Sequence, residues 1–388
     1  MSVWLLPENI SDMLPREARA IETLRQNFLN LVVSHGFELI RPPAIEYIDS
    51  LQVGTGADLD LRTFKIVDQI SGRLIGFRAD MTPQVARIDA HILNRKGVTR
   101  LCYAGSVLHA RPLHPMASRE PYVAGVEVFG SCSKQSDLEV IQLGIETLKK
   151  FGIKSINMDF GNVGVLRAVL AGKKISTETM RKLLYALSHK DISQILELSE
   201  ELGKKTVNDL RLIASTFGGE EVVPVLREAL SSYPGAVEAI DETLWLAQRS
   251  GADSWSFDFA DVHGYGYLTG VTFGVTVPKR FQAILRGGRY DDIGAQFGRN
   301  RPAVGFTVYL REIANLMEIH RPNAILAPCE PENKELQKAI EELRNNGNIV
   351  VVRLPEDEID SLRQAYHLNK VLVLTDGAWT VQPRPSAV

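Results

Sequence analysis

Apolar residues recur at helical spacing in two long segments of the first 150 residues. In segment 16–33 they fall on one face of a helix, and Gly36 follows as a stop signal. Segment 137–150 repeats the pattern and ends before Gly152. Both segments therefore predict amphipathic helices whose apolar faces pack on a common core.

Alternating apolar and polar positions predict strands between and after these helices. Segments 61–70 and 74–77 predict a hairpin that turns at Ser71-Gly72. The glycine pair Gly287-Gly288 predicts a tight turn. Further strands are expected at 37–40, 155–160, 255–261 and 303–310.

Two regions change this pattern and suggest how the chain is divided. Segment 161–250 is rich in Leu and Ala at helical spacing and predicts an insertion of about four or five helices. Segment 321–388 alternates strand and helix, which predicts a small α/β unit. We therefore expect an α+β protein: residues 1–320 form an antiparallel sheet flanked by helices, and residues 321–388 form a second domain.

Composition narrows the class of protein. The 388 residues carry a formal net charge of −3, which disfavours a general attraction to nucleic acid. The three cysteines form no CxxC pair, so neither a zinc site nor a disulfide framework is expected. We see no GxxxxGK phosphate loop, no Rossmann fingerprint, no signal peptide and no apolar run long enough to span a bilayer, so a cytoplasmic protein without a cofactor is expected.

Three segments resemble the signature motifs of the class II aminoacyl-tRNA synthetases, and most closely those of the histidyl enzyme. GFELIRPPAIEY at 36–47 resembles motif 1, segment 100–130 resembles motif 2, and segment 285–312 resembles motif 3. The resemblance implies a homodimer that forms through the motif 1 region. It also implies that segment 161–250 is the family's helical insertion and that 321–388 is a shortened anticodon-binding domain.

The resemblance assigns a set of ligand-binding residues. Asp80 and Thr82 lie in a run similar to the one that binds the substrate amine, although the pair also fits a helix cap before 84–93. Glu127 matches a carboxylate that binds the amine and ring of histidine. The complete expected histidine site is Asp80, Thr82, Tyr103, Arg111, Glu127, Tyr265 and Tyr267. His109 and His114 flank Arg111, but no third ligand favours a metal there.

Three positions where the histidyl enzyme carries an ATP-handling arginine hold other residues in this chain. They are Leu108, His263 and Glu312, and Tyr309 replaces a glycine that leaves room for adenine. Losing one preorganised charge-stabilising donor costs roughly 10²–10³ in rate, so adenylation is expected to be lost. Arg111 and Arg311 are the neighbouring cations that could substitute.

The whole pattern resembles the family of regulatory subunits of short-form ATP phosphoribosyltransferase, which look like histidyl-tRNA synthetases without working adenylation residues. The resemblance implies a non-catalytic chain that joins a catalytic phosphoribosyltransferase, activates histidine biosynthesis and mediates feedback by histidine, without tRNA. Two alternatives stay open. One is an active histidyl-tRNA synthetase or related adenylating enzyme, and the other is a free-standing histidine-binding or RNA-binding module.

Overall fold

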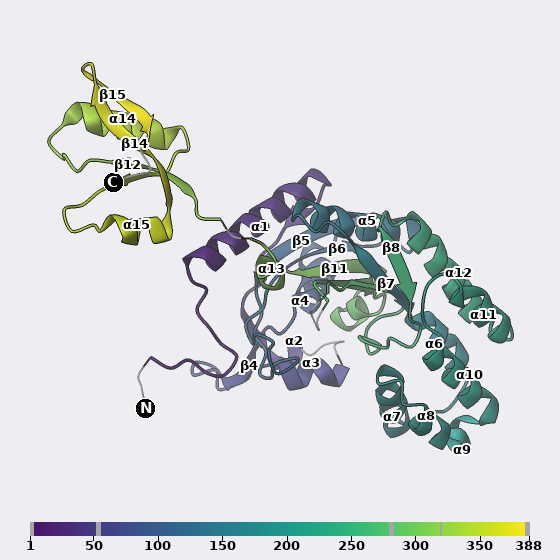
Figure 1. Ribbon diagram of the computed structural model, residues 1–388. Helices are drawn as coiled ribbons and strands as arrows, with labels where there is room; N and C mark the ends of the chain where they lie inside the picture. Colours follow the sequence, from purple (N-terminus) through teal and green to yellow (C-terminus); the bar gives the residue numbers. More distant parts are fainter. Residues whose placement is uncertain (1–3, 52–55, 279–282, 319, 385–388) are drawn as a thin grey trace. The chain divides into compact units, whose positions relative to one another are not determined.

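The computed structural model describes residues 4–51, 56–278, 283–318 and 320–384 (Figure 1). The chain divides into two compact units, Met1–Leu316 and Met317–Val388. No helix in these ranges is long and apolar enough to cross a membrane. Each unit is built around its own sheet.

The first unit contains an eight-stranded sheet in the order β1-β5-β6-β11-β10-β9-β7-β8. The inner pairs are antiparallel, while β1 with β5 and β7 with β8 are parallel at the two edges. The sheet is therefore mixed at its margins and antiparallel at its centre. Its strands are β1 Glu38–Leu39, β5 Thr99–Ser106, β6 Tyr122–Phe129, β7 Asn157–Asn162, β8 Ser254–Phe257, β9 Val271–Val275, β10 Leu285–Arg289 and β11 Ala303–Tyr309.

Two long helices cover one face of this sheet. They are α1, Pro15–Ser34, and α5, Lys134–Lys150, which lie beside the central strands in Figure 1. Phe306 of β11 points toward them and meets Phe28 of α1 edge to face, with 6.4 Å between ring centres. Side chains alternate along a strand, so Gly305 and its partner Glu127 face the opposite side.

Shorter elements cover that opposite face. They are α4, Thr82–Arg87, with the π-helix η1, Ile88–Leu93, and the 3-10 helix η2, Ile293–Phe297. A three-stranded sheet lies beside them, with β4, Leu74–Phe77, between β2, Ile45–Tyr47, and β3, Lys65–Val67. The short helices α2, Ile48–Leu51, and α3, Gly56–Arg62, connect these strands, and α13, Leu310–Ala314, follows β11.

The expected helical insertion is present between β7 and β8. Residues 163–249, all described, form seven helices rather than four or five, because short breaks divide the predicted segments. The helices are α6 Val163–Leu170, α7 Thr177–Ser188, α8 Ile192–Glu197, α9 Ser199–Leu202, α10 Lys204–Ser215, α11 Val222–Ala229 and α12 Pro234–Arg249.

The second unit has a four-stranded sheet in the order β13-β12-β14-β15. Its strands are β12 Asn323–Ala327, β13 Val350–Val352, β14 His367–Thr375 and β15 Ala378–Pro383, and its helices are α14 Lys334–Asn345 and α15 Ile359–Ala365. Leu336 and Ile340 of α14 pack with Ile325 and Leu372 in its core. The hairpin strand β15 was not predicted from the sequence.

The expected tight turn at Gly287-Gly288 is wrong. Both glycines lie inside β10 and pair with β11 and β9. A Cβ at Gly288 would lie 2.8 Å from the Val271 carbonyl oxygen, and one at Gly287 would clash with the Phe273 ring. The pair is therefore required for close packing within the sheet rather than for a turn.

Candidate functional site

Glu127 is the centre of the candidate site. It lies in β6, opposite Leu101 of β5 and Gly305 of β11, and only 1% of its surface is exposed to solvent. A Cβ at position 305 would clash with the Glu127 carboxylate, so glycine is needed for the carboxylate to lie over β11. Burying a carboxyl group is costly unless hydrogen bonds compensate, and the surroundings of Glu127 provide them.

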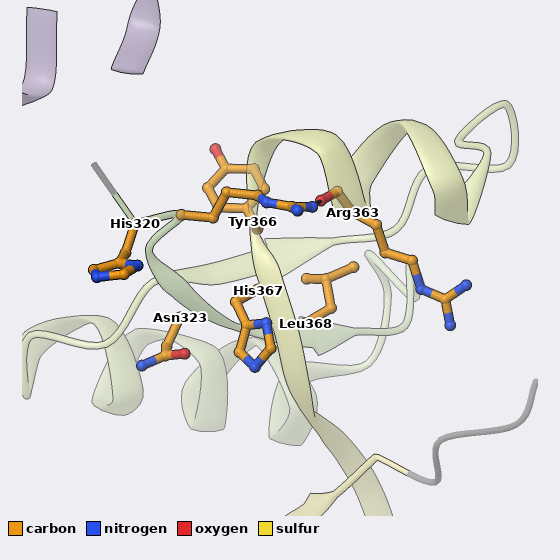
Figure 2. Close-up of a pocket in the computed structure, with 7 residues that line it drawn as sticks. His320, Asn323, Arg363, Tyr366, His367 and Leu368 are labelled. Carbon is orange, nitrogen blue, oxygen red and sulfur yellow. Dashed lines mark hydrogen bonds between the residues drawn. The ribbon is translucent and has the colours of Figure 1, made fainter. Parts of the chain in front are cut away.

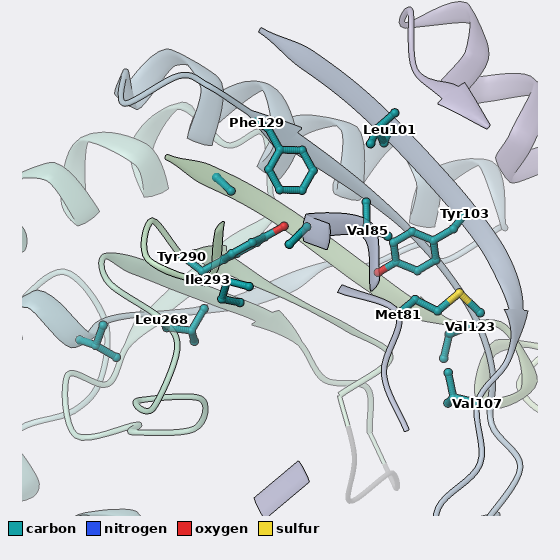
Figure 3. Packing of buried hydrophobic residues seen from close by; sticks show 13 residues of the cluster. Met81, Val85, Leu101, Tyr103, Val107, Val123, Phe129, Leu268, Tyr290 and Ile293 are labelled. Carbon is teal, nitrogen blue, oxygen red and sulfur yellow. The ribbon is translucent and has the colours of Figure 1, made fainter. Parts of the chain in front are cut away.

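Three hydroxyl groups donate hydrogen bonds to Glu127. Thr82 Oγ1 donates to Oε1 at 2.9 Å, Tyr103 OH donates to Oε1 at 3.2 Å, and Tyr290 OH donates to Oε2 at 2.5 Å. The donors come from α4, from β5 and from the residue after β10. In Figure 3 the hydroxyls of Tyr103 and Tyr290 point toward each other from opposite sides of the apolar cluster.

Burial dominates the electrostatics of this carboxyl group. Burial raises the pKa of Glu127 most strongly, the nearby Asp80 raises it further, and the hydroxyl donors lower it. The resulting pKa of Glu127 is about 8. Burial and the nearby Glu127 likewise raise the pKa values of Tyr103 and Tyr290. Glu127 is therefore mostly protonated at neutral pH, and a cationic group placed beside it would favour its ionised form.

Asp80 supports the same cluster from the start of α4. Its Oδ1 accepts a hydrogen bond from the Thr82 backbone N–H at 3.1 Å. The Thr82 hydroxyl is directed to Glu127 instead of capping the helix. Asp80 thus accepts a hydrogen bond from the amide at the helix start, and the Thr82 hydroxyl donates to the buried carboxyl group.

The two expected tyrosines lie on the segment between β8 and β9. Tyr267 is partly buried against the cluster, and burial together with Asp80 raises its pKa. Tyr265 also packs there, and Arg167 Nη2 donates to its carbonyl oxygen at 3.1 Å. The same guanidinium lies 4.9 Å from the Tyr265 ring centre. The insertion helix α6 therefore holds this segment next to the site.

Arg111 is the expected site residue that lies apart from the Glu127 cluster. It is exposed on the loop between β5 and β6, and among the described residues no hydrogen bond or ion pair joins it to Glu127 or Asp80. Of the seven expected residues, Asp80, Thr82, Tyr103 and Glu127 form one connected cluster, and Tyr267 and Tyr265 pack at its margin.

Two residues of the site were missed from the sequence. Tyr290 makes the shortest hydrogen bond to Glu127, and Thr307 Oγ1 lies 2.9 Å from the Tyr103 hydroxyl. Tyr290 is positioned by its neighbour Arg289, whose guanidinium forms a buried ion pair with Asp137 of α5 at 2.6 Å. A signal existed, because Arg289-Tyr290 directly follows the glycine pair of the motif 3 segment.

Arg286 Nη1 lies 4.0 Å from Asp261 Oδ2, close to His263, which is one of the positions that lack an ATP-handling arginine. His263 is exposed, and its Nδ1 lies 2.5 Å from Asp261 Oδ1. Arg311 is 7% exposed and donates to Glu17 Oε1 at 2.8 Å, to Ser11 Oγ at 2.7 Å and to Ser118 Oγ at 3.1 Å. Its guanidinium therefore ties the motif 2 loop to α1 and the N-terminal segment.

Space is also missing beside Arg311. The cavity lined by Tyr309, Arg311, Glu312 and the 113–122 loop measures about 10 Å³, which is at most the room for one water molecule. Within the described ranges, no three His, Cys, Asp or Glu side chains gather as ligands for a metal ion. The buried polar site at Glu127 consists of hydroxyl and carboxyl groups.

Comparisons with known families agree with the fold. The histidyl-tRNA synthetase family model matches residues 9–313, and the model described as ATP phosphoribosyltransferase subunit HisZ C-terminal domain matches residues 322–382. Among solved structures, one described as an ATP phosphoribosyltransferase regulatory subunit/histidyl-tRNA synthetase from Bacillus halodurans has a TM-score of 0.81 at 26% identity, covering 95% of this chain and 97% of the other. A histidyl-tRNA synthetase from Nostoc shares the fold, with a TM-score of 0.75 at 17% identity, covering 98% and 94%.

Relatives match over the full length. An ATP phosphoribosyltransferase regulatory subunit of Nitrosospira multiformis is 45% identical over 388 residues, which is 98% of each chain. The protein of that name in Burkholderia cenocepacia is 44% identical over 385 residues, covering 99% of this chain and 100% of the relative. The chain therefore belongs to the family of ATP phosphoribosyltransferase regulatory subunits, whose members are named as regulatory rather than catalytic chains and are built on a histidyl-tRNA synthetase-like core.

Proposed function

We propose that this chain is a non-catalytic subunit that activates a catalytic ATP phosphoribosyltransferase subunit. We also propose that it transmits feedback inhibition by histidine, the end product of histidine biosynthesis. Family membership supports the regulatory role. The observation that carries the histidine part is the buried Glu127 carboxyl group with its three hydroxyl donors, because it offers an acceptor for a cationic nitrogen in an otherwise apolar cluster.

Histidine fits the chemistry of this cluster. Its ammonium group would take the place next to Glu127 and Asp80, where a positive charge favours ionisation of the buried carboxyl group. Its imidazole would lie against the tyrosines of the cluster margin, Tyr265 and Tyr267. Arg111, exposed on the motif 2 loop, would reach the ligand carboxylate only if that loop closes on binding.

Loss of adenylation follows from the residues around Arg311. Adenylation needs cations that stabilise charge on the α-phosphate, and removing one such donor costs roughly 10²–10³ in rate. Here Leu108, His263 and Glu312 replace those cations, and Arg311 is occupied by Glu17 and two serines. A side chain held in this way cannot serve ATP without releasing the N-terminal segment.

Inhibition requires that histidine bind two states of the complex with different affinity, since otherwise it would shift nothing. The coupling free energy in such systems is typically about 1–3 kcal/mol. We place the contact with the catalytic subunit at the helical insertion and at the loop 113–119. Leu113 and Met116 of that loop are 43% and 85% exposed, which leaves apolar surface for a partner.

We also propose a homodimer through the region of the three-stranded sheet. Ile45, Tyr47 and Ile66 project from one face of that sheet and are 45%, 38% and 43% exposed. On the opposite face, Glu46 accepts hydrogen bonds from Gln84 and Arg87. Light scattering should give the mass of two chains, and Ile66→Glu should reduce it to one; a monomeric parent would refute the dimer.

The direct test of activation is an assay of phosphoribosyl transfer by the cognate catalytic subunit with and without this chain. Turnover should rise when the chain is added and fall again when histidine is added. The rival function, an active histidyl-tRNA synthetase, predicts histidine-dependent exchange of pyrophosphate into ATP by the chain alone. Sustained exchange would replace the regulatory proposal, whereas its absence together with activation would support it.

A further inference from the structure

The C-terminal unit contains an open depression of about 740 Å³ that lies far along the chain from the Glu127 cluster (Figure 2). It is formed where the amino ends of β12 and β14 meet the end of α15. Its size falls in the range of small-molecule sites, which is about 300–1,000 Å³. Its lining residues are His320, Arg321, Asn323, Arg363, Tyr366, His367 and Leu368.

The charge of this lining contrasts with the unit that surrounds it. Residues 317–388 contain eleven Asp or Glu residues and eight Lys or Arg residues, so the unit as a whole is acidic. None of the side chains that line the depression is acidic, and four of them are Arg or His. A basic depression in an acidic unit is a selective place for an anion, because the surrounding carboxylates repel it elsewhere.

The geometry separates the two arginines. Arg321 Nη1 donates to the Arg363 carbonyl oxygen, which fixes the Arg321 guanidinium at the last turn of α15 and leaves its other N–H groups available. Arg363 Nη1 lies 3.0 Å from Asp360 Oδ1, and in Figure 2 its guanidinium points away from the histidines. Arg321 is therefore the permanent charge of the site.

The remaining donors gather on one side of the depression. In Figure 2 the side chains of His320, Asn323 and His367 project from neighbouring backbone segments into the same region. The backbone N–H of His367 donates to the Pro322 carbonyl oxygen at 2.8 Å, and Asn323 pairs with His367 in the sheet, so their relative positions are set by β12 and β14. The depression thus presents two imidazoles and an amide on one side and the Arg321 guanidinium at the last turn of α15.

We propose that this depression binds a small anion that carries a diphosphate group. Guanidinium, imidazole and amide N–H groups are the donors that phosphate oxygens accept, and several converging donors favour a multiply charged anion over chloride. The site is separate from the Glu127 cluster and does not depend on histidine binding or on activation of a partner. It would give the C-terminal unit a ligand of its own.

The test is calorimetric titration of the full-length chain with sodium pyrophosphate at low ionic strength. Arg321→Gln and His367→Gln should each weaken binding by about fivefold to tenfold, because each removes a donor to a charged group. Arg353→Gln is the matched control: it removes one positive charge from the same unit, outside the depression, and should change the affinity by less than about twofold. Circular dichroism checks that each variant is folded.

The second variant protects the test against a folding artefact. Arg321→Gln removes a contact with α15 and could disturb the unit, whereas His367→Gln keeps the backbone hydrogen bond to Pro322. No binding by the parent, or equal losses in the control and the two site variants, would overturn the proposal. ATP that displaces pyrophosphate would support a nucleotide as the source of the diphosphate, and failure to displace it would support a free diphosphate.

A polyanion is the competing occupant and is distinguished in the same titration. Single-stranded RNA that binds more tightly than pyrophosphate, and loses affinity in both site variants, would overturn the small-anion assignment. RNA binding that is unchanged in the variants would leave the diphosphate site supported, because the depression would then not be its contact.

Discussion

Glu127 is a carboxyl group that the fold removes from water and then surrounds with hydroxyl donors. Thr82 and Tyr103 donate to one oxygen and Tyr290 to the other, so the acid is held in one orientation before any ligand arrives. Preorganisation of this kind reduces the ordering that binding would otherwise require.

Tyr290→Phe removes the donor with the shortest hydrogen bond to Glu127 while keeping the ring in the apolar cluster. We expect histidine affinity to fall about tenfold, because ionised Glu127 loses one charge-assisted hydrogen bond of about 1.5 kcal/mol or more. Calorimetric titration of the chain with histidine measures it. Tyr185→Phe, on an exposed tyrosine of the insertion, is the control and should bind like the parent; equal affinity in all three proteins would contradict the site.

Stability should depend on pH through Glu127. Folding raises its pKa from an ordinary value of 4.5 to about 8, so between these values the native state keeps a proton that the unfolded chain has lost. The contribution of Glu127 to the free energy of unfolding therefore decreases as pH rises from about 5 to about 8 and is constant outside that window.

Urea unfolding of the parent and of Glu127→Gln measures this slope. The difference between the two proteins should change steadily from about pH 5 to about pH 8, since the variant has no proton to lose at this position. Asp137, whose pKa burial raises to about 6, titrates lower and is present in both proteins, so it cancels. Parallel pH profiles for the two proteins would show that Glu127 does not titrate in this range.

At the scale of elements, Arg311 connects three parts of the chain that are distant in sequence. Its position at the start of α13 lets one guanidinium reach Glu17 of α1, Ser11 of the N-terminal segment and Ser118 of the motif 2 loop. The N-terminal segment is also held by Asn9, whose Nδ2 donates to the Pro115 carbonyl oxygen at 2.8 Å. Arg311 therefore acts as a structural clasp next to Glu312, the position at which the resemblance would place an ATP-handling arginine.

Arg311→Ala should therefore lower the free energy of unfolding by about 2–3 kcal/mol, because it removes charge-assisted hydrogen bonds from a mostly buried group. Urea unfolding at pH 7 measures the change. Arg95→Ala provides the matched control, since it breaks the ion pair between Arg95 and Glu38, whose two side chains are 45% and 55% exposed respectively. This variant should lower the free energy of unfolding by under about 1 kcal/mol. Equal costs for the two variants would contradict the clasp.

The elements also show what sequence reasoning could reach. The helix at 16–33 and the hairpin were predicted from their apolar periods, although the first hairpin strand is only Lys65–Val67 and Leu61 and Arg62 lie in α3. The two motif 2 strands were expected from the resemblance, and the structure contains them. The glycines at 287 and 288 were misplaced, because a glycine needed for close strand packing looks the same in sequence as a glycine in a turn. Strand β15 was missed because most of its residues are exposed and its apolar alternation is weak.

Some residues of the candidate site could also be predicted from the sequence, and others could not. Glu127, Asp80 and Thr82 were predicted because they fall inside recognisable motifs, and the structure places them together. Tyr290 and Thr307 were not, since they depend on strand register between segments that lie more than 150 residues from β5 and β6. Arg111 was expected at the site, but its position depends on a loop whose conformation no local pattern specifies.

At the scale of the whole molecule, one chain carries two units, each with a sheet and a core of its own. The first unit keeps the synthetase-like fold and its buried acid, while the cations for adenylation are absent and Arg311 has a structural partner. The second unit matches the C-terminal domain of the regulatory subunits and contains the basic depression. The proposed function uses this scaffold for sensing, since histidine bound at the Glu127 cluster would not be followed by turnover.

The central claim is tested most directly by measuring phosphoribosyl transfer by the assembled complex as histidine is added, with the parent chain and with Glu127→Gln. Both chains should raise the turnover of the catalytic subunit equally. The histidine concentration for half inhibition should rise at least about tenfold in the variant, since a charged partner of the ammonium group is lost. Unchanged inhibition in Glu127→Gln, or a catalytic subunit indifferent to the parent chain, would contradict the account.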